Sequence, residues 1–433
     1  MKVIKKHLFM VFAFVLVMNV HPWLWAQESQ VAPLKLNELI AEALSKNPDV
    51  LAAKSKWEVF RERPPQVGSL DDPMVGLAIV NLPTDNFSFR NEDMTMKELS
   101  VTQRVPYPGK RSLRSEMAQK EADAAFNDYE EVRVKVSRDM KTAYYDLFYV
   151  NKAIAVTEKN QEILKLFNKI TETKYSVGEG IQADILRAQV ELSKMIDELI
   201  TLSQTKRSLK AKINTLLHQP AFAPLGDPEQ VSWEKFSADP EELTQAAMAN
   251  RPLIQSMKQM VMRNRVGLKM AEKEYYPDFD FKLAYGQRDD GPMGRRADVI
   301  TAMVAFNLPL WYRSKQDRRV VEFQKEIRST QDQITAMTNE IRFMVSEKLT
   351  EIERAERQLE LLRTGIVPQA TLSLDSAMSA YRVNKIDFKS LLDNLMNLFK
   401  YEIQYYRLLT EHQKSVAEIE AAVGKSASKE RKG

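Results

Sequence analysis

Few residues in this 433-residue chain are of the types that perform catalysis or bind metal ions. There is no cysteine, which excludes a thiol nucleophile, a thiolate metal site and a disulfide framework. After the N-terminal segment only His218 and His412 remain, and both fall in predicted helices. The acidic pair Glu241-Glu242 stands at a predicted helix start, where carboxylates stabilise the helix. We therefore expect a protein that is not an enzyme and that has no cofactor and no metal centre.

Methionine thioethers offer a second kind of chemistry, because they can ligate soft metal ions. Met74, Met94, Met96 and Met293 lie in or near the predicted strands and loops. Methionine more often fills irregular apolar gaps. These residues therefore suit a soft-metal cargo or ordinary apolar packing.

Residues 1–26 have the composition of a cleaved secretory signal. Three lysines precede an apolar run over residues 8–20, and Ala26 supplies a small residue for cleavage. A membrane anchor is the alternative, but this run is shorter than the about 20 residues that a spanning helix needs. No later stretch is long and apolar enough either, so we expect the exported chain to be soluble or to insert as strands. The formal net charge of +4 gives no nucleic-acid footprint.

The elements that would position any functional residue are duplicated along the chain. Proline and tyrosine positions recur at offsets of 203 to 206 residues: Asn47-Pro48 as Arg251-Pro252, Pro73 as Pro277, Val105-Pro106 as Leu308-Pro309, and Tyr175-x-Val177 as Tyr381-x-Val383. Regular recurrence of this kind indicates a duplicated unit. We expect a first repeat over residues 27–220, a second over 221–423, and a disordered tail over 424–433.

Long windows with almost no glycine or proline predict helical rods far longer than the about 11 residues of an ordinary helix. We expect rods over residues 110–176 and 181–218 in the first repeat, and over 313–380 and 387–423 in the second. From Ile181 onward, the mostly apolar residues along one side of the rod are spaced alternately four and three residues apart. This period of 3.5 is typical of left-handed coiled-coil packing.

Short connections between the rods predict a helical hairpin tip in each repeat. The two connections are Val177, Gly178, Glu179 and Gly180 in the first repeat and Val383, Asn384, Lys385 and Ile386 in the second. Asn384 replaces a glycine, and asparagine also tolerates a left-handed backbone conformation. Each pair of rods is therefore expected to fold back antiparallel.

Four segments at the other end of the rods alternate apolar with polar or small residues, which predicts strands. They span about 73–81, 97–105, 278–286 and 299–307. The expected lipid-facing residues are Val75, Leu77, Ile79, Leu99, Val101, Phe279, Phe281, Leu283, Tyr285, Val304 and Phe306. Strands of this length cross a bilayer when tilted. Four strands cannot close a membrane barrel, so several chains would have to share one. The alternative is a small soluble sheet packed on helices.

Several motifs resemble the TolC family of outer-membrane efflux proteins. They are Gln103-Arg-Val-Pro-Tyr-Pro-Gly-Lys-Arg111, Tyr175-Ser-Val-Gly178 with Asp184, Val367-Pro-Gln-Ala370, and Tyr381-x-Val383 with Phe388, Leu391, Leu392 and Asp393. The resemblance covers about residues 34–423. It implies a mainly α fold with a small membrane β part: a homotrimer whose shared twelve-stranded β-barrel continues as a long periplasmic α-helical barrel.

The resemblance also implies a function, partners and site residues. The protein would be a passive outer-membrane exit duct of a Gram-negative tripartite efflux pump, working with a periplasmic adaptor (membrane fusion) protein and an inner-membrane pump of the resistance-nodulation-division type. The two tips would dock the adaptor. Asp184 and Asp393 would line the periplasmic entrance, where a ring of carboxylates favours cations. In the second repeat Ser390 occupies the position equivalent to Asp184, so one aspartate of the expected ring is missing there.

The cargo and two other functions stay open at this point. The run from Pro106 to Arg111 and the opening Asp72-Pro73-Met74 look most like the heavy-metal branch of the family, but drugs are an alternative cargo. A type I protein-secretion duct is a second possibility. A soluble periplasmic coiled-coil scaffold or adaptor would share the rods and tips but would need no strands of bilayer length.

Overall fold

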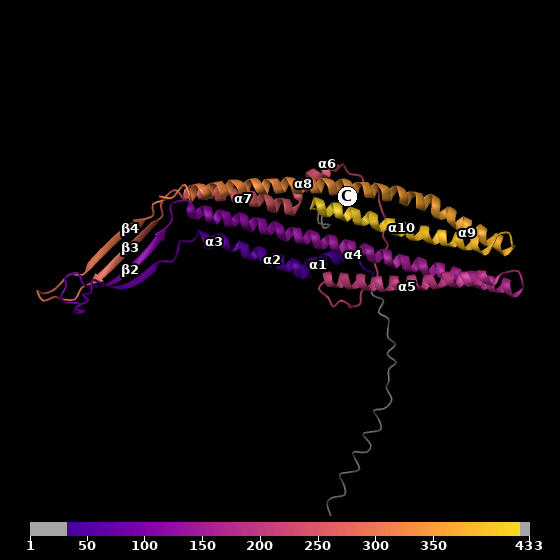
Figure 1. The fold of residues 1–433 in the computed structure, drawn as a ribbon, viewed down its shortest axis with the longest axis horizontal. Helices are drawn as coiled ribbons and strands as arrows, with labels where there is room; N and C mark the ends of the chain where they lie inside the picture. Colours follow the sequence, from indigo (N-terminus) through magenta and orange to yellow (C-terminus); the bar gives the residue numbers. More distant parts are fainter. Residues whose placement is uncertain (1–32, 425–433) are drawn as a thin grey trace, which may run out of the picture.

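The computed structural model describes residues 33–424. The expected signal peptide at residues 1–26, and the expected tail beyond Gly424, lie outside the described residues. The described chain is long and narrow, with a four-stranded sheet at one end and helical hairpins at the other (Figure 1). Among the described helices, none is both long and apolar enough to cross a membrane.

The two halves of the chain repeat the same order of elements. The first contains α1 (Leu36–Lys46), α2 (Pro48–Arg61), α3 (Arg63–Gly68), β1 (Met74–Val80), β2 (Met96–Val105), α4 (Lys110–Ser176) and α5 (Gln182–Leu216). The second contains α6 (Pro240–Asn250), α7 (Pro252–Lys273), β3 (Phe279–Gln287), β4 (Val299–Phe306), α8 (Gln316–Leu361), the π-helical turn η1 (Leu362–Ile366), α9 (Val367–Arg382) and α10 (Phe388–Val423). The 67 residues of α4 extend about 100 Å at 1.5 Å per residue.

The recurring prolines have a shared structural role. Pro48 and Pro252 occupy the first position of α2 and α7, where the missing N–H has no intrahelical partner to lose. Asn47 caps α2 by accepting a hydrogen bond from the Asp49 backbone N–H at 2.9 Å. The Asn47 side chain also donates to the Leu216 carbonyl at 3.0 Å, at the end of α5. The same proline chemistry therefore begins equivalent helices in both repeats.

The second long rod differs from the uninterrupted helix expected over residues 313–380. It begins at Gln316 and is divided into α8, η1 and α9. Pro368 has no N–H to donate, and its ring conflicts with an ordinary helical turn. The π-helical turn widens the helix just before this proline. In the first repeat, α4 has no proline and runs without a break.

The first repeat's second rod also ends slightly earlier than expected. α5 stops at Leu216, and His218 lies in the following turn with a left-handed φ of 57°. His218 is therefore not on a helix, contrary to the sequence-based expectation. Pro220 follows closely and disfavours continued helix. Within α5, Ala188, Met195 and Leu202 are buried at seven-residue intervals, as the coiled-coil period predicts.

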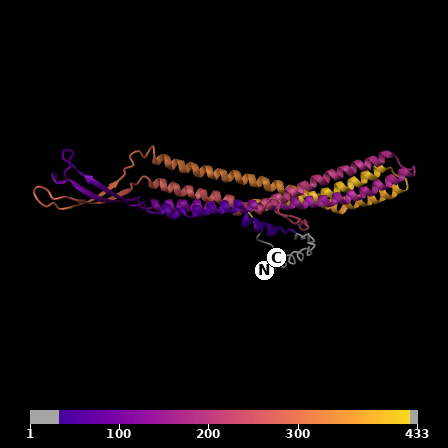
Figure 2. The same cartoon turned by 90° about the horizontal axis from the view of Figure 1, so that it is seen from below.

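The four strands form one antiparallel sheet in the order β1-β2-β3-β4. The two repeats meet where β2 pairs with β3. The helices next to the sheet keep the same lateral order: α3 packs on α4, α4 on α7, and α7 on α8 (Figure 1). Farther from the sheet, α4 packs on α5 and α10, and α10 packs on α9 (Figure 2). One chain is thus a curved wall with a free strand at each lateral edge.

Candidate functional site

The sheet has one apolar and one mixed polar face. Directly paired residues of antiparallel strands point to the same side, and the register joins Val75 to Val101, Val101 to Leu283, and Leu283 to Ala302. By the same register, all eleven residues expected to face lipid lie on this apolar face. Most of them are exposed, up to 84% for Leu77.

The expected lipid-facing residues omitted three apolar members of this face, which are Val105, Ala302 and Ile300. Ile300 pairs with Tyr285 and is 75% exposed. Its alternation with Ala302 and Val304 was a sufficient signal. Lys97 and Gln103 also fall on this face by register. Both lie near strand ends, where Lys97 pairs with Asp289 of the neighbouring loop at 3.2 Å.

The opposite face carries the other charged residues of the sheet. Lys282 Nζ donates to Glu98 Oε1 at 2.7 Å, and the register adds Thr102, Arg104 and Asp280 to the same side. Each pair of opposite charges comes from neighbouring strands. The sheet can therefore separate an apolar medium from water.

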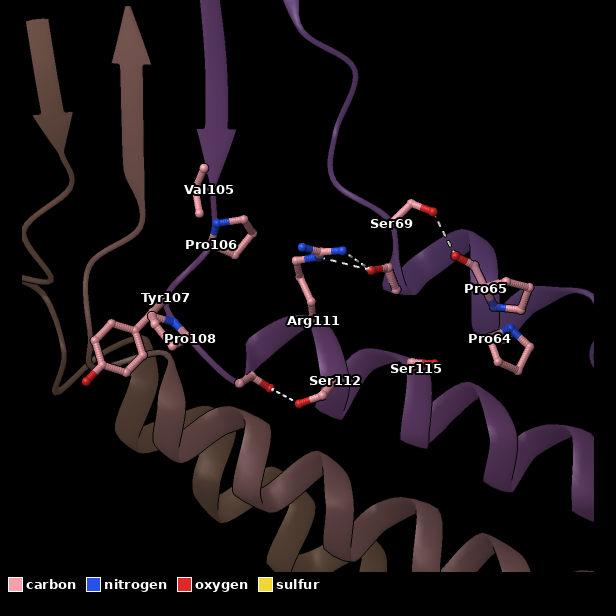
Figure 3. A pocket seen from close by; sticks show the side chains of 12 residues that line it. Pro64, Pro65, Ser69, Val105, Pro106, Tyr107, Pro108, Arg111, Ser112 and Ser115 are labelled. Atoms are coloured by element: carbon pink, nitrogen blue, oxygen red, sulfur yellow. Dashed lines mark hydrogen bonds between the residues drawn. The ribbon is translucent and has the colours of Figure 1, made fainter.

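The family motif at residues 103–111 builds the corner between β2 and α4. Gly109 has a left-handed φ of 92°, which glycine adopts without steric cost. Arg111 donates two hydrogen bonds to the Gly68 carbonyl, from Nε at 2.9 Å and from Nη2 at 2.8 Å (Figure 3). These bonds fix α3 against the start of α4. A cavity of about 630 Å³ lies between α3 and this corner.

Lys110, in the same motif, connects the first repeat to the second. Its side chain is 5% exposed and pairs with Asp278 at 2.7 Å. Lys110 Nζ also donates to the Tyr276 carbonyl at 2.8 Å, and the Tyr107 N–H donates to Asp278 at 2.9 Å. Burial raises the pKa of Asp278, but the hydrogen bonds from Lys110 and Tyr107 outweigh it and hold that pKa below the ordinary value. The motif is a structural junction.

The two predicted tips have the same backbone geometry. Gly178 has φ 80° and Asn384 has φ 60°. The following residues close equivalent hydrogen bonds, from Glu179 N to the Lys174 carbonyl at 2.8 Å and from Lys385 N to the Ala380 carbonyl at 2.9 Å. This is the Schellman pattern that ends helices. Asparagine therefore takes the place of glycine in the left-handed position.

The structure brings the two tips of one chain together. The Asn384 side chain accepts a hydrogen bond from Lys174 and donates one to Glu179 Oε2 at 3.2 Å. Val177 and Val383 are 65% and 62% exposed at the ends of the tips. Gly180 and Ile386 are half-buried, and Lys385 is exposed. The tips thus present apolar and charged side chains to the outside.

The two aspartates expected at the entrance differ in their surroundings. The Asp184 side chain is 17% exposed and lies 3.4 Å from Arg187. Burial raises the pKa of Asp184; Arg187 opposes this rise and nearby Asp387 adds to it. Asp393 is exposed and makes no ion pair within the described chain. No hydrogen bond or ion pair joins Asp184 to Asp393 in this part of the protein.

Asp387 was missed by the sequence analysis. It caps α10 by accepting a hydrogen bond from the Ser390 backbone N–H at 2.9 Å. Hydrogen bonds from the Ser390 side chain and backbone lower the pKa of Asp387. The spacing Asp387-x-x-Ser390 before a long helix was a recognisable cap signal. Ser390 therefore completes a helix cap.

The two histidines lie on different elements, His218 in the turn after α5 and His412 buried on α10. His412 is 2% exposed, and its Nε2 lies 3.2 Å from Glu356 Oε1. Glu356 also accepts a hydrogen bond from the Phe236 backbone N–H at 2.7 Å, so the pair fastens the connection between the repeats. Among residues 33–424, no group of three or more acidic or histidine side chains is arranged to hold a metal ion.

Comparison with known proteins links this architecture to a channel family. Residues 39–217 match the family model described as outer membrane efflux protein. Outer membrane efflux protein BepC of Brucella suis is 20% identical over 245 residues, which cover 56% of this chain and 53% of that protein. The match thus spans about half the length of this relative.

Solved structures share the fold over nearly the whole chain. VceC from Vibrio cholerae has a TM-score of 0.76 at 16% identity, covering 90% of this chain and 96% of that one. The outer-membrane channel OprN has a TM-score of 0.73 at 17% identity, covering 90% of each chain. The first repeat of this chain thus matches the outer membrane efflux protein family, and the fold of nearly the whole chain is that of the solved outer-membrane channels.

Proposed function

We propose that three copies of this chain form the passive exit duct of a tripartite efflux pump in the outer membrane of a Gram-negative bacterium. The observation that best supports this is the two-faced sheet. Its strands have 7 to 10 residues, close to the about 9–11 residues that cross a bilayer when tilted. An open sheet edge is not viable in lipid. Three sheets of four strands would close into one twelve-stranded barrel, with the apolar face toward lipid.

The helices would continue the duct through the periplasm. α4 alone extends about 100 Å. The tips at its far end are the surfaces that we assign to a periplasmic adaptor protein, which in turn would connect to an inner-membrane pump of the resistance-nodulation-division type. This assignment is supported by the exposed Val177 and Val383 and by the family match of the first repeat.

Asp184 and Asp393 are proposed to favour cations at the periplasmic entrance, and Asp387 joins them in this proposal. Asp184 and Asp387 are near enough for one to raise the pKa of the other. Three copies would place several carboxylates around a narrow opening, which concentrates cations. Heavy-metal ions or cationic drugs are both compatible with such an entrance.

The methionines give little support to a dedicated metal site in the sheet. Met74 pairs with Thr102 near the base of β1, whereas Met96 pairs with Val80 at the outer end. Met94 and Met293 are exposed in the outer loops. Since Met74 lies at the opposite end of the sheet from the other three, the four thioethers do not form one site, and we assign no metal-binding role to them.

Cell fractionation and channel recording test the proposed function. We expect the protein to require detergent for extraction, to have a trimeric mass in detergent, and to conduct ions across a planar bilayer without an energy source. A periplasmic protein that is soluble without detergent would instead support the scaffold function. A detergent-extracted monomer would contradict the shared barrel.

A further inference from the structure

An exposed apolar turn follows β4 at one lateral edge of the chain. Leu308, Leu310 and Trp311 are 61%, 68% and 73% exposed. Isolated exposed apolar residues are ordinary, but a contiguous group marks an interaction surface. We refer to residues 308–312 as the apolar turn.

The apolar turn is held in one conformation by backbone hydrogen bonds. Leu310 N donates to the Leu308 carbonyl at 2.9 Å, and Lys315 N donates to the Trp311 carbonyl at 3.1 Å. Before the turn, Asn307 Oδ1 accepts from the Asp278 backbone N–H at 2.6 Å. A preformed surface loses little conformational entropy when a partner binds.

A cavity of suitable character lies at the opposite lateral edge. It is the cavity of about 630 Å³ between α3 and the corner of β2 and α4 (Figure 3). Its lining includes Pro64, Pro65, Val105 and Pro106, together with Ser69. The rigid proline rings give it apolar walls, and it has room for apolar side chains of another chain.

The strand order brings these two surfaces together between neighbouring copies. β1 and β4 are the outer strands of the sheet. In a closed ring, β4 of one copy would lie antiparallel to β1 of the next. The base of β4 at Phe306 would then adjoin the base of β1 at Met74. The apolar turn of one copy would meet residues 64–73 of the next.

The junction inside one chain provides a template for this contact. After β2, Tyr107 stacks on Tyr276, with ring centroids 4.5 Å apart, and Lys273 lies 5.5 Å from the Tyr107 ring. Lys110 pairs with Asp278 in the segment before β3. An apolar group and a cation after one strand thus contact the residues that precede the next strand.

The same pattern is available between copies. Offsets of 203 and 204 residues place Leu310 at the position of Tyr107, Arg313 at that of Lys110, and Ser69 at that of Lys273. The counterpart of Asp278 is Met74, so the carboxylates near Arg313 would be those of two residues slightly earlier in the chain. Asp71 and Asp72 precede β1, and both are exposed. Arg313 and Lys315 are also exposed, and none of these four side chains makes an ion pair within the described chain. Opposite charges at the two edges favour their pairing.

We propose that the apolar turn of one copy docks into the cavity beside β1 of the next copy, with Arg313 and Lys315 facing Asp71 and Asp72. This proposal rests on the proposed trimeric duct and names the contact that joins neighbouring copies where the sheet meets the helices. The contact resembles the junction that Lys110 and Tyr107 make within one chain, with the acidic residues two and three positions earlier than the counterpart of Asp278.

Thiol cross-linking tests the docking directly, since the chain has no cysteine of its own. We would combine Leu310→Cys with Ser69→Cys and treat the detergent-extracted protein with a short bismaleimide. The double variant should yield covalent dimers and trimers, and each single variant should remain monomeric on a denaturing gel. Leu310→Cys with Ser193→Cys, which is exposed on the distant α5, is the matched control and should not cross-link.

Charge reversal tests the ion pairs. Asp72→Lys and Arg313→Asp should each raise the dissociation constant of the trimer about tenfold. The combined variant should restore most of the lost affinity. Two single effects that simply add in the combined variant would count against the pairing.

The outcomes separate this inference from the proposed function. If the wild-type protein is a trimer by mass but the Leu310 and Ser69 pair does not cross-link, the docking is refuted and the duct stands. If the wild-type protein is a monomer, both fail. A lipid contact is a third outcome: with Trp57→Phe and Trp233→Phe, strong quenching of Trp311 fluorescence by brominated phospholipid would place the turn in lipid and overturn the docking.

Discussion

Replacing Lys110 by methionine should destabilise the protein more than any other lysine substitution on α4. Lys110 is 5% exposed and its partner Asp278 is 14% exposed. Methionine keeps an apolar stem of similar length, so packing changes little. The substitution removes the bond to Asp278 and leaves the Tyr276 carbonyl without its donor.

The expected cost follows from this geometry. Removing one partner of a buried ion pair costs about 3–5 kcal/mol. Asp278 keeps the Tyr107 N–H at 2.9 Å and Arg104 at 3.6 Å, which favours the lower end. We therefore expect Lys110→Met to lower the free energy of unfolding by about 3 kcal/mol. Adding Asp278→Asn should recover part of this loss, because no unpaired buried charge remains.

Denaturant titration in detergent, followed by circular dichroism, measures this difference. The matched control is Lys120→Met, on the same helix, whose ion pair with Asp123 at 3.2 Å is about a third exposed and worth less than about 1 kcal/mol. Since the folded-state pKa of Asp278 is lowered, its contribution is present above the unfolded-state pKa and is lost as pH falls through the folded-state pKa. Equal losses from the two lysine substitutions would refute the reasoning.

Three further predictions concern the tips and the entrance. Asp184→Asn combined with Asp393→Asn should shift the reversal potential of the reconstituted channel toward lower cation selectivity, and an unchanged potential would contradict a role at the entrance. Burial raises the pKa of Asp184 and hydrogen bonding lowers that of Asp387. As the pH is lowered, Asp184 should therefore be protonated first, and cation selectivity should begin to decrease at a pH above the ordinary aspartate pKa. Asp184→Asn should abolish this first step in a selectivity titration. Gly178→Ala should cost about 1–2 kcal/mol of local stability because φ is 80°; no atom lies near the added Cβ, so the cost comes from the backbone alone. Asn384→Gly should cost less than about 1 kcal/mol. Hydrogen exchange at the two tips would distinguish the two effects.

The main features of the fold could be predicted because they depend on local patterns. The alternation of Val75, Leu77 and Ile79 reports one face of a strand from sequence neighbours alone. Long windows without glycine or proline similarly indicate helix, and Gly178 marks its end. The duplication added a second, independent example of each element. The fold class and the shared apolar face of the sheet were therefore within reach of the sequence.

Contacts between residues far apart in the sequence could not be predicted from local sequence patterns. Lys110 and Asp278 are 168 residues apart, and nothing in their local sequence indicates a buried pair. The π-helical turn before Pro368 depends on how the helix adapts around a proline, which has more than one solution. Asp387 was visible as a helix cap, but its position beside Asp184 depends on the packing of α10 against the first repeat.

The duplicated tips are alike in backbone and opposite in charge. Glu179 and Lys385 occupy equivalent positions, 206 residues apart, and each closes the same hydrogen bond after a left-handed residue. The shared backbone geometry does not require opposite charges at these two positions. In the proposed trimer, six tips would alternate between an acidic and a basic residue around the entrance. A partner that contacts all six must then present alternating charges or use two different surfaces for each copy, since a uniform ring of one charge would be repelled by every second tip.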